Sequence, residues 1–217
     1  MEMEKGLIEL GLSESEASRI SPLMEKYINE IILFNSAYNL TNTSDHDELV
    51  IRHIFDSLAP YSTFCKLFEN AHNNPDFTAG DIGSGGGLPG IPLAAAFPDV
   101  NFCLVERMAK RCAFLENVAA ILGLKNVTVI NSEAEKVQKE KFDVITFRAF
   151  RPLDDKMTKT LLGITKKGGT LAAYKARMDS IKTEMEDIKK IVPDYEVVNL
   201  TVPGLNDSER NLVLIHN

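Results

Sequence analysis

The stretch DIGSGGGLPGIP, residues 81–92, decides the fold, because an apolar strand-like run gives way to a helical run within it. Glycines suit such a turn, since they adopt positive φ without strain and let the backbone approach a ligand closely. Two glycine patterns overlap here. Gly85, Gly87 and Gly90 satisfy G-x-G-x-x-G, whereas the same turn counted from Asp81 and Gly83 reads D-x-G-x-G-x-G.

The first pattern is typical of dinucleotide-binding turns, although a single match is weak evidence. A carboxylate at position 81 would repel a pyrophosphate, but it would attract a cofactor with an ammonium and a sulfonium group. Glu106 ends the next strand, 23 residues after Gly83, where an acid accepts hydrogen bonds from ribose hydroxyls in both ligand classes. Ala134 and Glu135 follow the third strand and are placed to edge an adenine. We therefore expect S-adenosylmethionine, with an NAD-dependent dehydrogenase as the alternative.

Strand-like and helical runs alternate from residue 77 onward. Strands are expected at residues 77–82, 100–106, 126–131, 142–148, 168–175, 195–202 and 211–217, and helices at 90–97, 108–123, 133–138, 152–165 and 178–191. The alternation predicts an α/β fold with a mostly parallel seven-stranded sheet and helices on both faces. The last two strands have no helix between them, which predicts an antiparallel hairpin that closes one edge of the sheet and supplies an antiparallel edge strand.

The first part of the chain is helical in pattern. Residues 3–38 and 45–58 carry helical periodicity, and Ser13 with Glu16 has the spacing of a capping box. The polar stretch ENAHNNPD, residues 69–76, is the expected boundary between the N-terminal helices and the main domain. We therefore expect an N-terminal helical extension over residues 1–70 and the main domain over residues 71–217.

Charge is unevenly distributed along the 217 residues, whose net charge is −7. Residues 1–50 hold ten acids and three bases, whereas residues 101–192 hold eighteen bases and twelve acids, which leaves a basic half for an anionic partner. The three cysteines lack C-x-x-C spacing, so we expect no metal site. No apolar run approaches the roughly 20 residues that span a bilayer, and no signal peptide begins the chain, so we expect a cytoplasmic protein without a membrane segment.

The residues at the end of the fourth strand limit which kinds of substrate atom can accept the methyl group of S-adenosylmethionine. Residues 145–153, ITFRAFRPL, lack the (N/D)-P-P-(Y/F) turn common in amine methylation, and no cysteine stands at a strand tip to attack a cytosine. Lys175 suits ribose methylation, but Arg148 replaces the acid which that reaction favours. A guanine N7 needs no deprotonation, so positioning alone would suffice. Arg148 and Lys175 then suit phosphate or guanine O6.

The segment RHIFDSLAP, residues 52–60, has two interpretations. Arg52, Asp56 and Ala59 share one helix face, with His53 beside it. Either Arg52 and Asp56 form an ion pair and His53 caps the helix, or this polar face covers the mouth of the cofactor site.

Taken together, these motifs resemble the RsmG (GidB) family of bacterial 16S ribosomal RNA guanine-N7 methyltransferases. The resemblance covers nearly the whole chain, through residues 38–41 (YNLT), 52–58 (RHIFDSL), 81–94 (DIGSGGGLPGIPLA), 106–118 (ERMAKRCAFLENV), 134–135 (AE), 142–150 (FDVITFRAF), 174–175 (YK) and 209–215 (ERNLVLI). It implies a class I (Rossmann-like) methyltransferase fold behind a helical extension. It also implies one methyl transfer from S-adenosylmethionine to a guanine N7 of 16S ribosomal RNA, free or in the small ribosomal subunit.

The turn pattern and the resemblance together assign the site. Cofactor-binding residues are expected at Asp81, Gly83, Ser84, Gly85, Gly87, Leu88, Glu106, Ala134, Glu135 and Arg148. RNA-binding residues are expected at Arg148, Arg151 and Lys175, and positioning residues at Arg52, His53, Asp56, Arg148 and Lys175. A methyltransferase for another RNA or a small molecule, and a non-catalytic nucleotide-binding factor in ribosome assembly, remain as alternatives.

Overall fold

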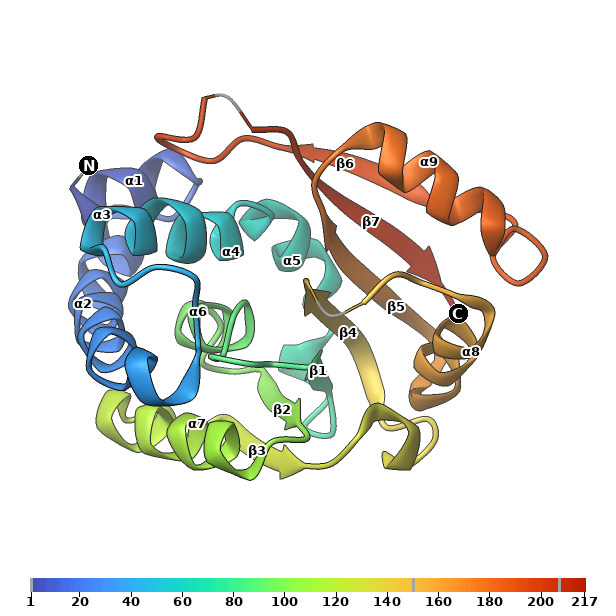
Figure 1. The fold of residues 1–217 in the computed structure, drawn as a ribbon, viewed down its shortest axis with the longest axis horizontal. Coiled ribbons are helices and arrows are strands. Elements are labelled where there is room, and N and C mark those ends of the chain that lie inside the picture. The colour runs from blue at the N-terminus through green and yellow to red at the C-terminus, as the bar shows by residue number, and fades with distance from the viewer. Residues whose placement is uncertain (1, 150, 207) are drawn as a thin grey trace.

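The structure, a computed structural model, describes residues 2–149, 151–206 and 208–217. Its sheet comprises β1 (Thr78–Ile82), β2 (Asn101–Glu106), β3 (Val127–Asn131), β4 (Phe142–Arg148), β5 (Thr165–Lys175), β6 (Glu196–Leu200) and β7 (Arg210–His216). The strand order is β3-β2-β1-β4-β5-β7-β6, as Figure 1 shows, and β1 to β5 pair in parallel. The seven-stranded, mostly parallel sheet is therefore confirmed.

The final hairpin closes one side of this sheet. β7 runs antiparallel to both β5 and β6, so the predicted hairpin is present. The one described strand that runs opposite to the others is β7, which lies next to the edge of the sheet, and β6 forms the edge itself. β7 reaches this place because it completes the hydrogen bonding of β5, which has β4 on its other side.

The strand order determines where a ligand can bind. The chain places β2 on one side of β1 and β4 on the other, so successive connections leave β1 and β4 in opposite directions. In open parallel sheets such a switch point leaves a crevice at the carboxyl ends of the strands. The glycine turn follows β1 directly at this edge.

Helices cover the sheet between the strands (Figure 1). They are α6 (Gly90–Ala96), α7 (Ala109–Leu122), the 3₁₀ turn η3 (Ala134–Lys136), α8 (Asp155–Ile164) and α9 (Met178–Asp187). α8 begins three residues later than expected because Asp154 is its N-cap, its carboxylate accepting a hydrogen bond from the Met157 amide at 2.7 Å. Phe150, which ends the motif at residues 142–150, lies outside the described residues.

The N-terminal part is helical as predicted, with more interruptions. Its elements are α1 (Met3–Glu9), α2 (Glu14–Tyr38), α3 (His46–Leu49), the π-helical segment η1 (Val50–Phe55), α4 (Asp56–Leu58), α5 (Tyr61–Leu67) and the 3₁₀ turn η2 (Ala71–Asn73). Gly11, at φ 98°, divides the expected helix 3–38, and the Ser13–Glu16 capping box starts α2. The helix α5 was not expected from the sequence.

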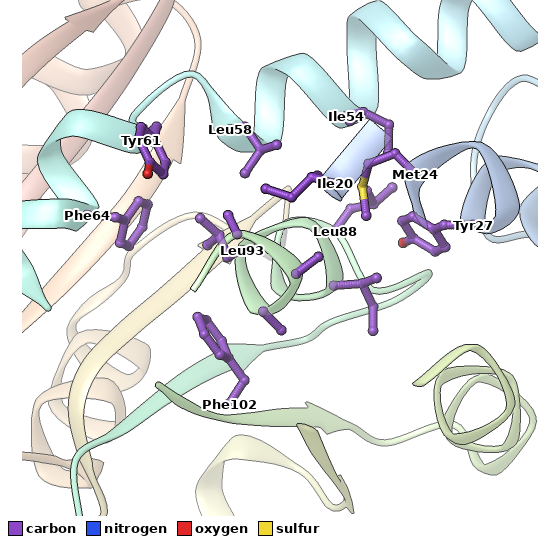
Figure 2. Close-up of a cluster of buried hydrophobic side chains, with 14 of the residues drawn as sticks. Ile20, Met24, Tyr27, Ile54, Leu58, Tyr61, Phe64, Leu88, Leu93 and Phe102 are labelled. Carbon is purple, nitrogen blue, oxygen red and sulfur yellow. The ribbon is translucent and has the colours of Figure 1, made fainter. Parts of the chain in front are cut away.

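One apolar core joins the N-terminal helices to the sheet. Figure 2 shows Met24 and Tyr27 of α2 facing Leu88 and Leu93 of the glycine turn and α6, with Phe102 of β2 beneath. All five belong to the same buried cluster. The division at residues 70 and 71 stays a prediction, and the two parts share a core across it. No helix among the described residues is long and apolar enough to cross a membrane.

Candidate functional site

Two adjoining cavities lie along the carboxyl ends of the strands. The larger, of about 910 Å³, is bounded by the glycine turn, the segment after α2, the helix that carries residues 52–56, and the ends of β4 and β5. The smaller, of about 590 Å³, is bounded by the ends of β1 and β2 and by the turn after β3. Gly83, Arg111, Ala149 and Arg151 line both cavities, so the two form one continuous site.

The glycine turn has the backbone that its sequence requires. Gly83, Gly85 and Gly87 have φ values of 72°, 59° and 94°, a region that side chains with a Cβ rarely adopt. Gly83 and Gly85 line the larger cavity with Ser84 and Leu88. Gly87 lines neither cavity: a Cβ there would lie 2.6 Å from Ile91, so this glycine serves packing.

Asp81 lies beneath the turn instead of at the surface of either cavity. Its Oδ2 accepts hydrogen bonds from the Ser84 hydroxyl and from the Gly90 amide, the latter at 3.0 Å, while Oδ1 has no partner. Burial raises the pKa of Asp81 to about 6, against the effect of these hydrogen bonds. The expected contact between this carboxylate and a cofactor ammonium stays a prediction, because Asp81 is fully buried and lines neither cavity. In the described geometry, Asp81 holds the turn in shape.

The smaller cavity has the features of a nucleoside site. Glu106, 4% exposed at the end of β2, accepts hydrogen bonds from the amides of Gly85 at 3.0 Å and Met108 at 2.8 Å. These amides hold the carboxylate at the cavity edge, and each oxygen keeps a lone pair for a further donor. Ala134 and Glu135 line the opposite side. The structure thus brings together the three residues expected at the ribose and adenine.

The larger cavity contains a buried carboxylate held by two arginines. Asp56 Oδ2 accepts from Arg148 at 2.8 Å, and Oδ1 accepts from Arg210 Nε at 3.0 Å. The interpretation in which Arg52 pairs with Asp56 is therefore wrong: both oxygens accept from guanidinium groups of β4 and β7, and Arg52 is exposed. Arg52, His53 and Asp56 all line this cavity, as expected for a polar helix face at its mouth.

His53 is a neutral hydrogen-bond acceptor in this network. Its Nδ1 lies 3.1 Å from an Arg148 Nη, and the carbonyl of Arg52 accepts from the other Nη at 3.3 Å. Burial, together with the charges of Arg148 and Arg52, lowers the pKa of His53 to about 4. Because two neighbouring cations would repel each other, the imidazole stays neutral and accepts while the guanidinium donates.

The cations expected to bind RNA already have acidic partners. Lys175 Nζ lies 2.6 and 2.9 Å from the two carboxylate oxygens of Glu184, and both side chains are about 15% exposed. Arg151 pairs with Glu135 at 3.2 Å and is 47% exposed. The charge of Lys175 is therefore neutralised within the fold, and Arg151 is the more accessible of the two.

Among the residues that sequence reasoning missed, four line or support the site through side-chain hydrogen bonds or charge. They are Tyr27 on α2, Arg111 on α7, Glu184 on α9 and Arg210 on β7. None lies in a glycine turn or directly after a parallel strand. Arg111 and Arg210 fall within quoted motifs, ERMAKRCAFLENV and ERNLVLI, which was the signal available for them.

These residues fit S-adenosylmethionine. The smaller cavity offers an acid at the ribose position, and the positive-φ glycines let the backbone approach where the two cavities meet. Solved methyltransferases share the fold. A SAM-dependent methyltransferase from Aquifex aeolicus aligns over 79% of this chain and 93% of its own, with a TM-score of 0.54 and 18% identity. The tRNA (m1A58) methyltransferase TrmI of the same organism aligns over 72% and 68%, with a TM-score of 0.54 and 13% identity.

Closer relatives are found by sequence. The family model GidB, described as rRNA small subunit methyltransferase G, matches residues 20–213. A Treponema denticola protein named ribosomal RNA small subunit methyltransferase G is 41% identical to this chain, over 97% of this chain and 92% of its own length. A Neisseria meningitidis protein of the same name is 35% identical, over 98% of this chain and 96% of its own length. The chain therefore belongs to the GidB family, rRNA small subunit methyltransferase G, and is an S-adenosylmethionine-dependent methyltransferase.

Proposed function

We propose that this enzyme transfers the methyl group of S-adenosylmethionine to N7 of a guanine in the RNA of the small ribosomal subunit. The main supporting observation is that the possible proton acceptors in the larger cavity already have hydrogen-bond partners within the protein. When bound, S-adenosylmethionine supplies an electrophilic methyl group on a sulfonium. The remaining question is which nucleophile the cavity can present to it.

The described residues of this cavity include no group placed to remove a proton. Asp56 is paired with two arginines, and Glu184 accepts from a lysine ammonium and from the Leu153 amide. His53 has a pKa of about 4 and already accepts a hydrogen bond. The hydroxyl of Tyr174 donates to a backbone carbonyl at 2.6 Å, and burial raises its pKa. A hydroxyl or amine target would require a base, whereas the N7 lone pair of guanine attacks directly.

The charge of the cavity favours an RNA substrate. Its described lining includes six cationic side chains, namely Arg52, Arg111, Arg148, Arg151, Lys175 and Arg210, against two carboxylates, in a chain whose net charge is −7. A cleft lined mainly by positive charges attracts an anionic ligand more strongly than the net charge of the whole protein suggests. Arg148, held by three acceptors from one helix, has donors left to orient guanine O6.

The names of the family and of the relatives refer to the ribosomal RNA of the small subunit, which supports the expected 16S ribosomal RNA or the small subunit as partner. Because that RNA is made and assembled in the cytoplasm, we place the reaction there. In this scheme Glu106 binds the ribose of the cofactor, Ala134 and Glu135 flank its adenine, and Arg148 with Arg151 approaches the RNA.

The test is methylation of small subunits purified from cells that lack this gene, with radiolabelled S-adenosylmethionine. Reduction and aniline cleavage at 7-methylguanosine, followed by primer extension, should give one new stop that depends on enzyme and cofactor. Label incorporated without such a stop would refute the N7 assignment. Label in a different RNA, with none in the small subunit, would refute the substrate.

A further inference from the structure

The helix α2 reaches the glycine turn through one buried hydroxyl. Tyr27 is fully buried, and its Oη donates a hydrogen bond of 2.6 Å to the carbonyl of Gly86. Figure 2 shows the ring extending from α2 toward the segment that carries Leu88. Burial raises the pKa of Tyr27 well above its usual range, so the phenol remains a donor.

The segment that follows α2 covers the same turn. A Cβ at Gly86 would lie 3.2 Å from Leu40 Cβ, and a Cβ at Gly87 would lie 3.0 Å from Tyr27 Oη. The carbonyl of Asn39 accepts a hydrogen bond from Arg111 at 2.7 Å, which fastens this segment to α7. Leu40 and its two successors, residues 41 and 42, line the larger cavity.

Hydrogen bonds hold the glycine turn from two sides. On one side, Glu106 accepts from the Gly85 amide at 3.0 Å. On the other, Tyr27 donates to the Gly86 carbonyl, on the peptide that enters Gly87. Glycine loses more conformational freedom on ordering than any other residue, so a run of glycines needs such external contacts to keep one conformation.

We propose that Tyr27 is a positioning residue for the S-adenosylmethionine site: its hydroxyl orients the Gly86 peptide and thereby holds the glycine turn in its binding conformation. The N-terminal helices then determine cofactor affinity although Tyr27 lines neither cavity. The inference rests on the cofactor of the proposed function and is independent of the RNA target.

Tyr27→Phe removes the hydroxyl and keeps the ring. Isothermal titration of the purified protein with S-adenosylmethionine should give a Kd about three- to tenfold higher than wild type, the effect expected for one buried neutral hydrogen bond. Hydrogen exchange of the amides at residues 85–88 in the ligand-free protein should accelerate.

Tyr61→Phe is the matched control. Its hydroxyl donates to Glu16 at 2.7 Å, it is 8% exposed, and it lines neither cavity. We expect its Kd and its exchange at residues 85–88 to equal wild type. An unchanged Kd in Tyr27→Phe would overturn the proposal, and so would an equal rise in both variants. Neither titration contains RNA, so failure here leaves the N7 test untouched.

Discussion

Substitution of Asp56 by asparagine tests whether the buried carboxylate holds the larger cavity together. Its side chain is 7% exposed, and the partners Arg148 and Arg210 are 14% and 23% exposed. Asparagine keeps the size and one acceptor oxygen but loses the charge. Two guanidinium groups then face each other without the anion between them.

Removing one partner of a buried ion pair costs about 3–5 kcal/mol. Because the arginines border a cavity that admits solvent, we expect the lower end, about 3 kcal/mol. A change of 1 kcal/mol shifts Tm by roughly 2–4 °C in a chain of this size, so Tm should fall by about 6–12 °C. Arg148 should also lose its orientation, and methylation should slow.

Glu133→Gln is the matched control, since it breaks the pair with Lys136, in which both side chains are about half exposed or more. Its Tm should stay near wild type, because exposed pairs contribute little. The measurement is thermal unfolding of the three proteins by circular dichroism. A Tm loss in Asp56→Asn no larger than in Glu133→Gln would refute the structural role of Asp56.

Three further outcomes are expected. Glu106→Ala should weaken S-adenosylmethionine binding about tenfold or more in calorimetry, because charge-assisted hydrogen bonds contribute about 1.5–3 kcal/mol; equal affinity would contradict its role at the ribose. The single-turnover methylation rate should be nearly flat from about pH 7 to 8.5, above the pKa of about 6 of Asp81, because His53, with a pKa of about 4, stays neutral throughout. A tenfold rise per pH unit that His53→Gln abolishes would show a base in use. Arg52→Gln, at an exposed cation of the larger cavity, should weaken RNA binding and reduce the slope of log affinity against log salt by about one. Lys159→Gln, which lines neither cavity, should leave that slope unchanged.

The sheet and the cofactor turn could be predicted from the sequence because their signals are local. Strand and helix periodicity, positive-φ glycines and an acid at a strand end each depend on a few neighbouring residues. The prediction of Glu106 at the edge of the smaller cavity needed only the rule that parallel strands end at the same edge. The order of β7 and β6 was beyond such rules, since periodicity identifies a strand but not its neighbours.

Ion-pair partners were decided by tertiary structure alone. Spacing within one helix offered Arg52 as a partner of Asp56 in one of two interpretations, whereas the partners are Arg148 and Arg210, 92 and 154 residues away. Local spacing cannot predict them, because a buried carboxylate selects the cations that the fold brings to it and not those nearest in the chain. The same holds for Tyr27 and the glycine turn, which α2 brings together across 59 residues. Local patterns were enough to predict the cofactor turn and the fold class, whereas the packing of distant elements decides how that turn is held and which cations stay exposed in the larger cavity.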